Sequence, residues 1–328
     1  MNRAFLNLVI TAIAVSTALI SCKKDDNVTT VPKKGDVYVA GCDNDYAVLW
    51  KNGVAQKLSD GIQYTCAYSV FVSGNDVYIA GQEHYGTKYY VAKIWKNGIG
   101  QNLTDGTCDA WANSIYVFNS DVYVAGVEYY EDKGVAKIWK NGVAQNLTDG
   151  TRNAWANSVY ISGGDVYVAG FDGYYAVLWK NGIVQNFIDE TYGAFAEAVY
   201  VSDGDVYVAG YGKNFAKLWK NGVLQNLNDG TLWNAAHSIY VSGDDVYVTG
   251  YEHNTQNTSI AKLWKNGVVQ NLTAGTNYSQ ATSVYVSDNN VYVAGFDGYY
   301  AVLWKNGVAQ KLTAGTHETE AFSVFVVE

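Results

Sequence analysis

Apolar and polar residues alternate along most of the chain with the two-residue period of extended strands. In SVYISGGDVYVAG, residues 158–170, two runs of β-branched and aromatic residues flank a Ser-Gly-Gly-Asp segment, a pattern that predicts a hairpin. A second hairpin is predicted in VLWKNGIVQ, residues 177–185, because Asn-Gly tolerates the positive φ angles of a type I′ turn. Beyond the N-terminal segment no stretch sustains the apolar period of a helix, so the pattern predicts an all-β protein.

This pair of hairpins recurs seven times. The marker DVYVAG, or a close variant of it, begins at residues 36, 76, 121, 165, 205, 245 and 290. Each unit of about 42 residues holds four predicted strands, named A (SVYV-like), B (DVYVAG), C (AKLWKNG) and D (VAQNL). Units of this length with four antiparallel strands are typical of the blades of a β-propeller.

The ends of the repeat indicate a closed ring. The first blade has no strand A of its own, because the first copy of that strand is Ser69–Val72, whereas a spare copy, Ser323–Val326, ends the chain. We therefore expect a seven-bladed β-propeller over residues 36–328, with four antiparallel strands per blade. In it the C-terminal strand completes the blade that residues 36–60 begin, which removes an open sheet edge.

The N-terminal segment is expected to lie outside the fold. Residues 1–21 have the short apolar run of a secretory signal peptide, with an uncleaved membrane anchor as the alternative. Leu19-Ile20-Ser21-Cys22 resembles the lipobox of bacterial lipoproteins. This resemblance implies cleavage before Cys22 and attachment of acyl chains such as palmitate, which would leave residues 22–35 as a lipidated cysteine and flexible tether.

Two further resemblances bear on location. Lys23–Asp26 resembles the surface-export signal of Bacteroidota lipoproteins, and the alternative is an ordinary charged tether that faces the periplasm. The LWKNG repeats of residues 36–328 are similar to those of uncharacterised propeller lipoproteins of the same phylum. Together they imply a protein anchored by lipid to the outer membrane and exposed on the cell surface, and they bring no catalytic residues.

Charge and cysteine content exclude several classes of partner. Without residues 1–21 the chain has 21 basic and 31 acidic residues, and this acidic surface argues against nucleic acid. With Cys22 lipidated, Cys42, Cys66 and Cys108 remain, which permits at most one disulfide and shows no metal-binding spacing. The four histidines, at residues 84, 237, 253 and 317, fall in four separate segments. We therefore expect neither a metal nor a cofactor.

The two faces of the predicted ring differ in sequence. The A–B and C–D turns lie on one face, here the turn face, and are nearly identical in every unit. The B–C and D–A loops lie on the other, here the loop face, and are variable and rich in Tyr and Trp. Loops on a rigid scaffold commonly carry recognition, although unconstrained drift is the alternative. Because the tether enters on the A–B side, the loop face is expected to point away from the membrane.

The candidate binding residues lie at or near the residues that precede strand A, and we expect these to ring the axis. Aromatic rings beside amides and carboxylates suit a glycan, and they suit a protein partner equally well, so a scaffold in an outer-membrane assembly is the alternative. For the two candidate tryptophans of the third and fourth blades, loop packing is an equal alternative. The candidates are Tyr68, Trp111, Asn113, Trp155, Asn157, Phe195, Glu197, Trp233 and His237.

Catalysis is the weakest hypothesis. Glu197 could act with Asp189 and Glu190 as paired carboxylates of a hydrolase or lyase, but acids are abundant and no GxSxG motif is present. We therefore expect a protein that is not an enzyme. The WKNG motif is expected to be structural, with Asn-Gly forming the C–D turn and the tryptophan buried between blades. These tryptophans are Trp50, Trp95, Trp139, Trp179, Trp219, Trp264 and Trp304.

Overall fold

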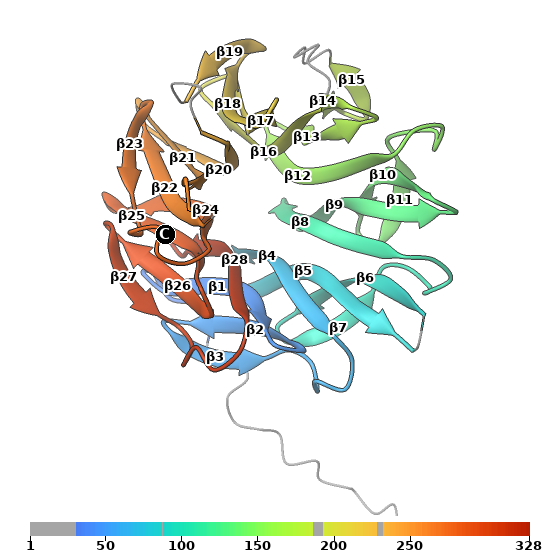
Figure 1. Cartoon of the computed structure of the whole chain (residues 1–328). Coiled ribbons are helices and arrows are strands. Elements are labelled where there is room, and N and C mark those ends of the chain that lie inside the picture. The colour runs from blue at the N-terminus through green and yellow to red at the C-terminus, as the bar shows by residue number, and fades with distance from the viewer. Residues whose placement is uncertain (1–30, 87, 186–192, 228–231, 257) are drawn as a thin grey trace, which may run out of the picture.

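The computed structural model describes residues 31–328 except 87, 186–192, 228–231 and 257. Its strands form seven four-stranded antiparallel sheets arranged around a central axis (Figure 1). The seven-bladed β-propeller expected from the repeats is therefore confirmed. In this part of the chain, no helix is both long and apolar enough to cross a membrane.

Each blade runs outward from the axis in the order A, B, C, D. The A strands are β4 (Thr65–Ser73), β8 (Ala110–Phe118), β12 (Ala154–Ser162), β16 (Ala194–Ser202), β20 (Asn234–Ser242), β24 (Ser279–Ser287) and β28 (Thr319–Val326). The B strands are β1 (Val37–Asp43), β5 (Asp76–Tyr85), β9 (Asp121–Tyr130), β13 (Asp165–Asp172), β17 (Asp205–Gly212), β21 (Asp245–His253) and β25 (Asn290–Asp297). The C strands are β2 (Tyr46–Lys51), β6 (Tyr89–Lys96), β10 (Lys133–Lys140), β14 (Tyr175–Lys180), β18 (Phe215–Lys220), β22 (Ser259–Lys265) and β26 (Tyr300–Lys305). The D strands are β3 (Val54–Lys57), β7 (Ile99–Asn102), β11 (Val143–Asn146), β15 (Ile183–Gln185), β19 (Val223–Asn226), β23 (Val268–Asn271) and β27 (Val308–Lys311).

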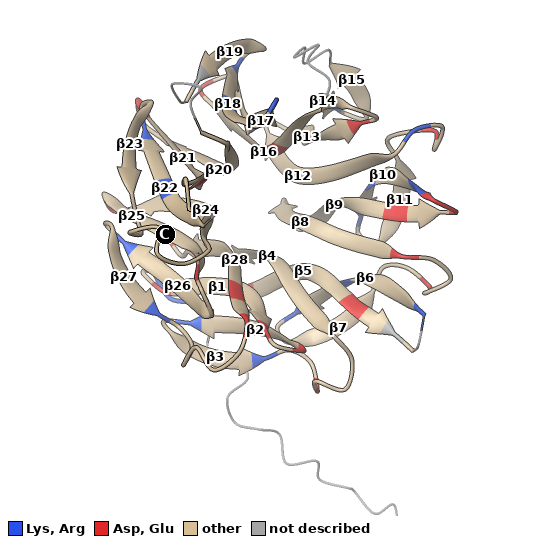
Figure 2. Ribbon diagram, viewed as in Figure 1, with Lys and Arg blue, Asp and Glu red and all other residues tan. Residues whose placement is uncertain are grey.

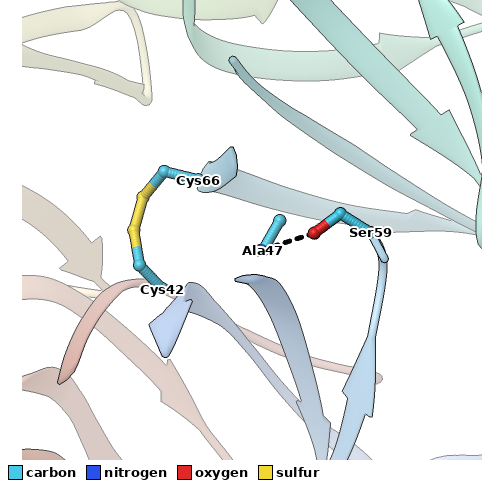
Figure 3. The surroundings of a disulfide bond; sticks show 4 residues. All are labelled: Cys42, Ala47, Ser59 and Cys66. Atoms are coloured by element: carbon cyan, nitrogen blue, oxygen red, sulfur yellow. Dashed lines mark hydrogen bonds between the residues drawn. A yellow bond between two sulfur atoms is a disulfide. The ribbon is translucent and has the colours of Figure 1, made fainter. Parts of the chain in front are cut away.

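The C-terminal strand closes the ring as predicted. The first blade has the strand order β28-β1-β2-β3, and Val37 pairs with Val326. The Gly35 amide donates a hydrogen bond to the Val327 carbonyl over 2.8 Å, so both ends of the propeller meet on the turn face. One disulfide, Cys42–Cys66, joins β1 of the first blade to β4 of the second (Figure 3). The expectation of at most one disulfide is confirmed, since Cys108 forms none.

The WKNG tryptophans are the largest buried side chains between the blades. All seven are at most 2% exposed. Trp179, for example, packs in one cluster with Tyr123 and Ile138 of the preceding blade. Their predicted role as the framework is confirmed.

The rest of the WKNG motif ties the turn to strand B of the same blade. Asn141 has a φ of 51°, as the tight turn requires. Its Oδ1 accepts a hydrogen bond from the Val122 amide over 2.8 Å, and its Nδ2 donates to Asp121 over 2.7 Å. Lys140 forms an ion pair with the same aspartate at 2.7 Å. These contacts explain why KNG and the aspartate of DVYVAG occur together.

Each A strand begins before its SVYV segment and contains a β-bulge. In β8 the register shifts between Ala112 and Ser114, so Asn113 is the extra residue. The invariant glycine of strand B lies opposite, and a Cβ on Gly126 would overlap the Trp111 carbonyl oxygen. The seven bulge residues are Tyr68, Asn113, Asn157, Glu197, His237, Thr282 and Phe322. They therefore lie on strands, which corrects the expectation that the D–A loops hold them.

Candidate functional site

A cavity of about 530 Å³ lies on the axis at the loop face. All seven bulge residues line it, so the prediction that these positions ring the axis is confirmed. Trp111, Trp155 and Gln280, each two residues before a bulge, complete the lining. The bulge explains this convergence, because an extra residue in strand A directs one more side chain toward the axis.

The lining divides into an aromatic arc and a polar arc. In the aromatic arc Tyr68 and Phe322 pack edge to face with ring centroids 5.4 Å apart. Trp111 and Trp155 stack on each other at 5.6 Å, with an interplanar angle of 17°. The polar arc consists of Asn113, Asn157, Glu197, His237, Gln280 and Thr282.

Hydrogen bonds between blades hold part of the polar arc in place. Asn113 Nδ2 donates to the Ala156 carbonyl and Asn157 Nδ2 to the Ala196 carbonyl, both over 3.1 Å. Asn157 Nδ2 also lies 3.3 Å from a carboxylate oxygen of Glu197. The amide side chains are thus fixed before any ligand arrives, which limits the entropy lost on binding.

Burial shifts the titration of the two ionisable groups in the polar arc. The side chain of Glu197 is half-buried, and desolvation of its charged form raises its pKa to about 7. Desolvation lowers the pKa of His237 to about 4, against the opposite effect of a hydrogen bond with Gln280. At neutral pH the imidazole is uncharged, whereas Glu197 is divided between its protonated and its charged form.

The A strands carry a distinctive charge pattern. Glu197 and Glu320 are their only acidic residues, and they contain no Lys or Arg. Figure 2 shows the same pattern, with the basic residues lying away from the strands that surround the axis. Burial, and next to it the charge of Glu318, raises the pKa of Glu320 to about 7. The cavity therefore has acidic surroundings.

Seven aromatic side chains form a closed ring around the axis, each three residues after the bulge residue of its A strand. Neighbouring ring centroids lie 4.6–5.0 Å apart all the way round. The ring consists of Phe71, Tyr116, Tyr160, Tyr200, Tyr240, Tyr285 and Phe325. Sequence analysis assigned these residues no role, although an aromatic residue in the third position of every SVYV-like segment was a visible signal.

Two of the nine candidate residues do not line the cavity. Phe195 stacks on Tyr211 with centroids 5.0 Å apart. Trp233 lies just before β20, is 47% exposed and stacks on His253 at 4.6 Å. Thr282, Phe322 and Gln280 complete the lining; the repeat register points to them, yet they are not among the candidates.

The tryptophans of the cavity belong to a ladder of stacked rings. Tyr90 stacks on Trp111 at 5.9 Å, and Phe171 stacks on Trp155 at 6.0 Å. Trp155 Nε1 also donates a hydrogen bond to the Tyr129 hydroxyl over 3.0 Å. Both ring faces of each tryptophan are thus covered by neighbours, so these residues pack the loop face and present their edges to the cavity.

Candidate metal and catalytic groups add little to the site. Within the described ranges, no three His, Cys, Asp or Glu side chains are placed to hold a metal ion together. His84 contacts Gln63, whereas His317 contacts Asp43 across the closure of the ring. Asp189 and Glu190 lie outside the described residues.

Comparison with known proteins identifies the fold. No protein-family model matches the chain, and no curated sequence is similar to it. Among solved structures, a puromycin-hydrolysing peptidase of Mycobacterium tuberculosis superposes on 89% of this chain with a TM-score of 0.60 and 10% identity. The chain spans 54% of that peptidase chain, so the resemblance shows the propeller fold alone. A chain of a nidogen/laminin complex matches with a TM-score of 0.46 and 6% identity over 89% of this chain and 98% of that one, too weakly to carry an argument.

Proposed function

We propose that this propeller is a lipid-anchored binding protein of the bacterial outer surface whose axial cavity takes an extracellular glycan. The observation that carries the proposal is the cavity on the loop face, with an aromatic arc on one side and a polar arc on the other. Its volume of about 530 Å³ falls within the usual range of ligand sites. A sugar has apolar CH groups, which can lie against Tyr68, Phe322 and the edges of the two tryptophans, and a rim of hydroxyls, which can reach the polar arc.

The proposal contains no catalytic step. The two acids expected to act with Glu197 in catalysis are Asp189 and Glu190, and both lie outside the described residues. The resemblance to the peptidase is one of fold, and its activity is that of a chain about twice as long. We therefore give Glu197 a binding role.

Glycan binding can be tested with the full chain in mild detergent on a glycan array. Tyr68→Ala and Trp111→Ala each remove part of the aromatic arc, and we expect each to weaken binding about tenfold or more. Trp233→Ala is the matched control, because Trp233 is an aromatic residue on the same face but outside the cavity. Thermal unfolding of each variant identifies those that fail to fold.

Two results would contradict this assignment. If the folded wild-type protein binds no glycan, the proposed ligand class is wrong. If Trp233→Ala abolishes binding while the two cavity variants bind normally, the site lies on the rim of the loop face instead.

Anchoring and location rest on the sequence signals. Replacing Cys22 with Ser should release the protein from the membrane fraction, because no acyl chain would then hold it. Replacing Lys23–Asp26 with alanines should keep it in the membrane but protect it from protease added to intact cells. Retention of the Cys22→Ser protein in the membrane would contradict lipid anchoring.

A protein partner is the second candidate function, and a different observation favours it. Among the described residues, the aromatic side chains with the largest exposed fractions, 40–63%, lie in or beside the loops of the loop face. Tyr and Trp are frequent anchors in protein interfaces because they bury a large area at a small entropic cost. This aromatic rim consists of Tyr64, Tyr130, Tyr174, Tyr175, Trp233, Tyr278 and Tyr299.

Two identical loops make this alternative testable. Residues 168–182 and 293–307 have the same sequence, and their loops expose Tyr174 and Tyr299. Two copies of one contact can raise the affinity for a repetitive partner far above that of either alone. Under this alternative, Tyr174→Ser with Tyr299→Ser should abolish co-purification of a membrane partner, whereas Trp111→Ala should leave it intact.

A further inference from the structure

We propose that the axial cavity selects ligands with a protonated primary amine, an amino sugar with a free amine rather than its N-acetylated counterpart. This inference rests on the proposed glycan-binding function and specifies its ligand. It follows from which hydrogen-bonding groups remain available to a ligand and from the charge of the lining.

Several donors of the polar arc are already engaged: Gln280 Nε2 donates to the Tyr278 hydroxyl over 2.8 Å, whereas His237 Nε2 has no hydrogen-bond partner among the described residues. Nδ2 of Asn113 and of Asn157 faces a backbone carbonyl of the next blade, which can only accept. Thr282 has one hydroxyl proton, and its Oγ1 lies 2.7 Å from the Ala321 carbonyl and 3.0 Å from that of Ala294. Asn113, Asn157 and Thr282 therefore have no free proton to offer except the second amide proton of each asparagine.

The acceptors of the same residues remain available. Oδ1 of Asn113 and of Asn157 accepts no hydrogen bond from any described residue, and both side chains line the cavity. Oγ1 of Thr282 keeps its lone pairs. Together with the Glu197 carboxylate they form an arc of acceptors that requires a donor from the ligand.

No basic residue among the described residues of the lining balances the negative charge of Glu197. None of the described residues that line the cavity is Lys or Arg. Desolvation is the cause of the raised pKa of Glu197, and no neighbouring cation opposes it. The charge of Glu320 also contributes, after burial and Tyr64, to the raised pKa of Tyr68 on the opposite arc. A half-buried carboxylate in such surroundings is stabilised by any cation that enters.

Other groups that face Glu197 do not supply that cation. Burial keeps His237 of β20 neutral by lowering its pKa to about 4. Burial raises the pKa of Tyr211 of β17 and of Tyr251 of β21. The Glu197 charge adds to this shift for Tyr211 and, after that of Tyr278, for Tyr251, so both stay neutral and can only donate or accept hydrogen bonds. Asn157 of β12 is an uncharged amide. An ammonium has three donors and a positive charge, so it satisfies the acceptors and the carboxylate together.

The same features disfavour other charged ligands. A uronic acid or a phosphate would bring negative charge toward Glu197 and would find acceptors where it needs donors. A neutral or N-acetylated sugar could donate hydroxyl protons but would leave the carboxylate without a counter-ion. We therefore expect a ranking in which the free amine binds best.

The test compares matched probes by calorimetry at about pH 7, with the full chain in mild detergent. The probes are an oligomer of glucosamine, the N-acetylglucosamine oligomer of equal length, and the non-saccharide amine spermidine. We expect the free-amine oligomer to bind about tenfold or more tightly than its acetylated counterpart. Glu197→Gln should reduce this ratio to about one, whereas Glu131→Gln, on an exposed loop of the same face, should leave it unchanged.

Each outcome separates this inference from the function on which it rests. Equal or tighter binding of the acetylated oligomer would overturn the amine selectivity and leave the glycan site standing. Binding of spermidine alone, lost in Glu197→Gln, would support the amine selectivity and contradict the glycan. If no probe binds the folded protein, or if Glu197→Gln keeps the preference for amines, the inference is overturned.

Discussion

At the scale of single residues, serines at the start of the SVYV segments link the blades around the axis. The hydroxyl of Ser158, for example, accepts a hydrogen bond from the Val199 amide of the next blade over 3.3 Å. Six blades have this serine, but the fifth has Ala198, opposite the amide of Ile239. The six serines are Ser69, Ser114, Ser158, Ser238, Ser283 and Ser323.

Restoring the seventh serine should stabilise the protein. Ala198→Ser adds an acceptor for the Ile239 amide, and we expect it to raise the free energy of unfolding by about 0.5–1.5 kcal/mol. Ser158→Ala is the reverse control; it should cost about 1–3 kcal/mol because it leaves the Val199 amide without its acceptor. Urea unfolding of both variants measures the effect, and a destabilised Ala198→Ser protein would contradict the assigned role of these serines.

The carboxyl group of Glu197 should make stability depend on pH. Its pKa of about 7 in the folded protein exceeds the value of about 4.3 expected in the unfolded chain. The folded state therefore favours the protonated form, so this group stabilises at low pH and its contribution is lost as the pH rises toward 7. His237 acts in the opposite direction, because its folded pKa of about 4 lies below its usual 6.5.

Comparing Glu197→Gln with wild type separates the contribution of the Glu197 carboxyl group to the pH dependence of stability from that of His237. The free energy of unfolding of the variant, relative to wild type, should rise between about pH 4.5 and pH 7 and stay constant above that range. Urea unfolding at several pH values measures the difference. A difference that does not change with pH would show that burial does not disfavour the charged form of Glu197.

At the scale of elements, the turn between strands C and D is a unit that each blade repeats. Asn141 adopts a positive φ and binds strand B through two hydrogen bonds, and Lys140 adds an ion pair to the same aspartate. In the last blade Asn290 replaces this aspartate and accepts the equivalent hydrogen bond from Asn306 over 2.9 Å. In the last blade the turn asparagine therefore keeps its hydrogen bonds to strand B although strand B has no aspartate to form the ion pair.

Asn141→Ala should cost about 1–3 kcal/mol of stability. The substitution places alanine at a positive φ and leaves the Val122 amide without its acceptor. Val143→Ala is the control, since this side chain lies two residues away and is 72% exposed; it should change stability by less than about 0.5 kcal/mol. Equal effects of the two substitutions in urea unfolding would show that the turn contributes no special stability.

At the scale of the whole molecule, closure of the ring depends on contacts between the two ends of the chain. Strand β28 supplies the inner strand of the first blade, and the Cys42–Cys66 disulfide joins that blade to the second. A disulfide stabilises chiefly because it restricts the unfolded chain. It thus reinforces the blade that is assembled from both termini.

Removal of this disulfide should lower the free energy of unfolding by about 2–4 kcal/mol. The double variant Cys42→Ser, Cys66→Ser can be compared with wild type in urea, with and without reducing agent. A reducing agent should destabilise the wild type and leave the double variant unchanged. Cys108→Ser is the control, because Cys108 is not in a disulfide, and a loss of stability in it equal to that of the double variant would contradict the assignment.

The repeat in the sequence predicted many of the residues that line the cavity. Aligning the seven units brings Asn113, Glu197 and Phe322 to one position, and the ring requires equivalent positions to meet at the axis. The same alignment could not show that this position is a bulge, because a bulge depends on the pairing of strand A with strand B. It also could not exclude Phe195 and Trp233, whose side chains turn toward neighbouring rings.

The sequence by itself determined the number of blades, their four strands, the closing role of the last strand and the burial of the WKNG tryptophans. These features depend on periodicity and on repeats that lie within about 45 residues of one another. Only the tertiary structure decided the pairing of Cys42 with Cys66, the stacking of Trp111 on Trp155, and the acceptors that face the axis. These features arise between blades, where residues 24 positions apart in the disulfide and 43 in the Asn113 hydrogen bond meet, and the pattern within one blade does not specify such contacts.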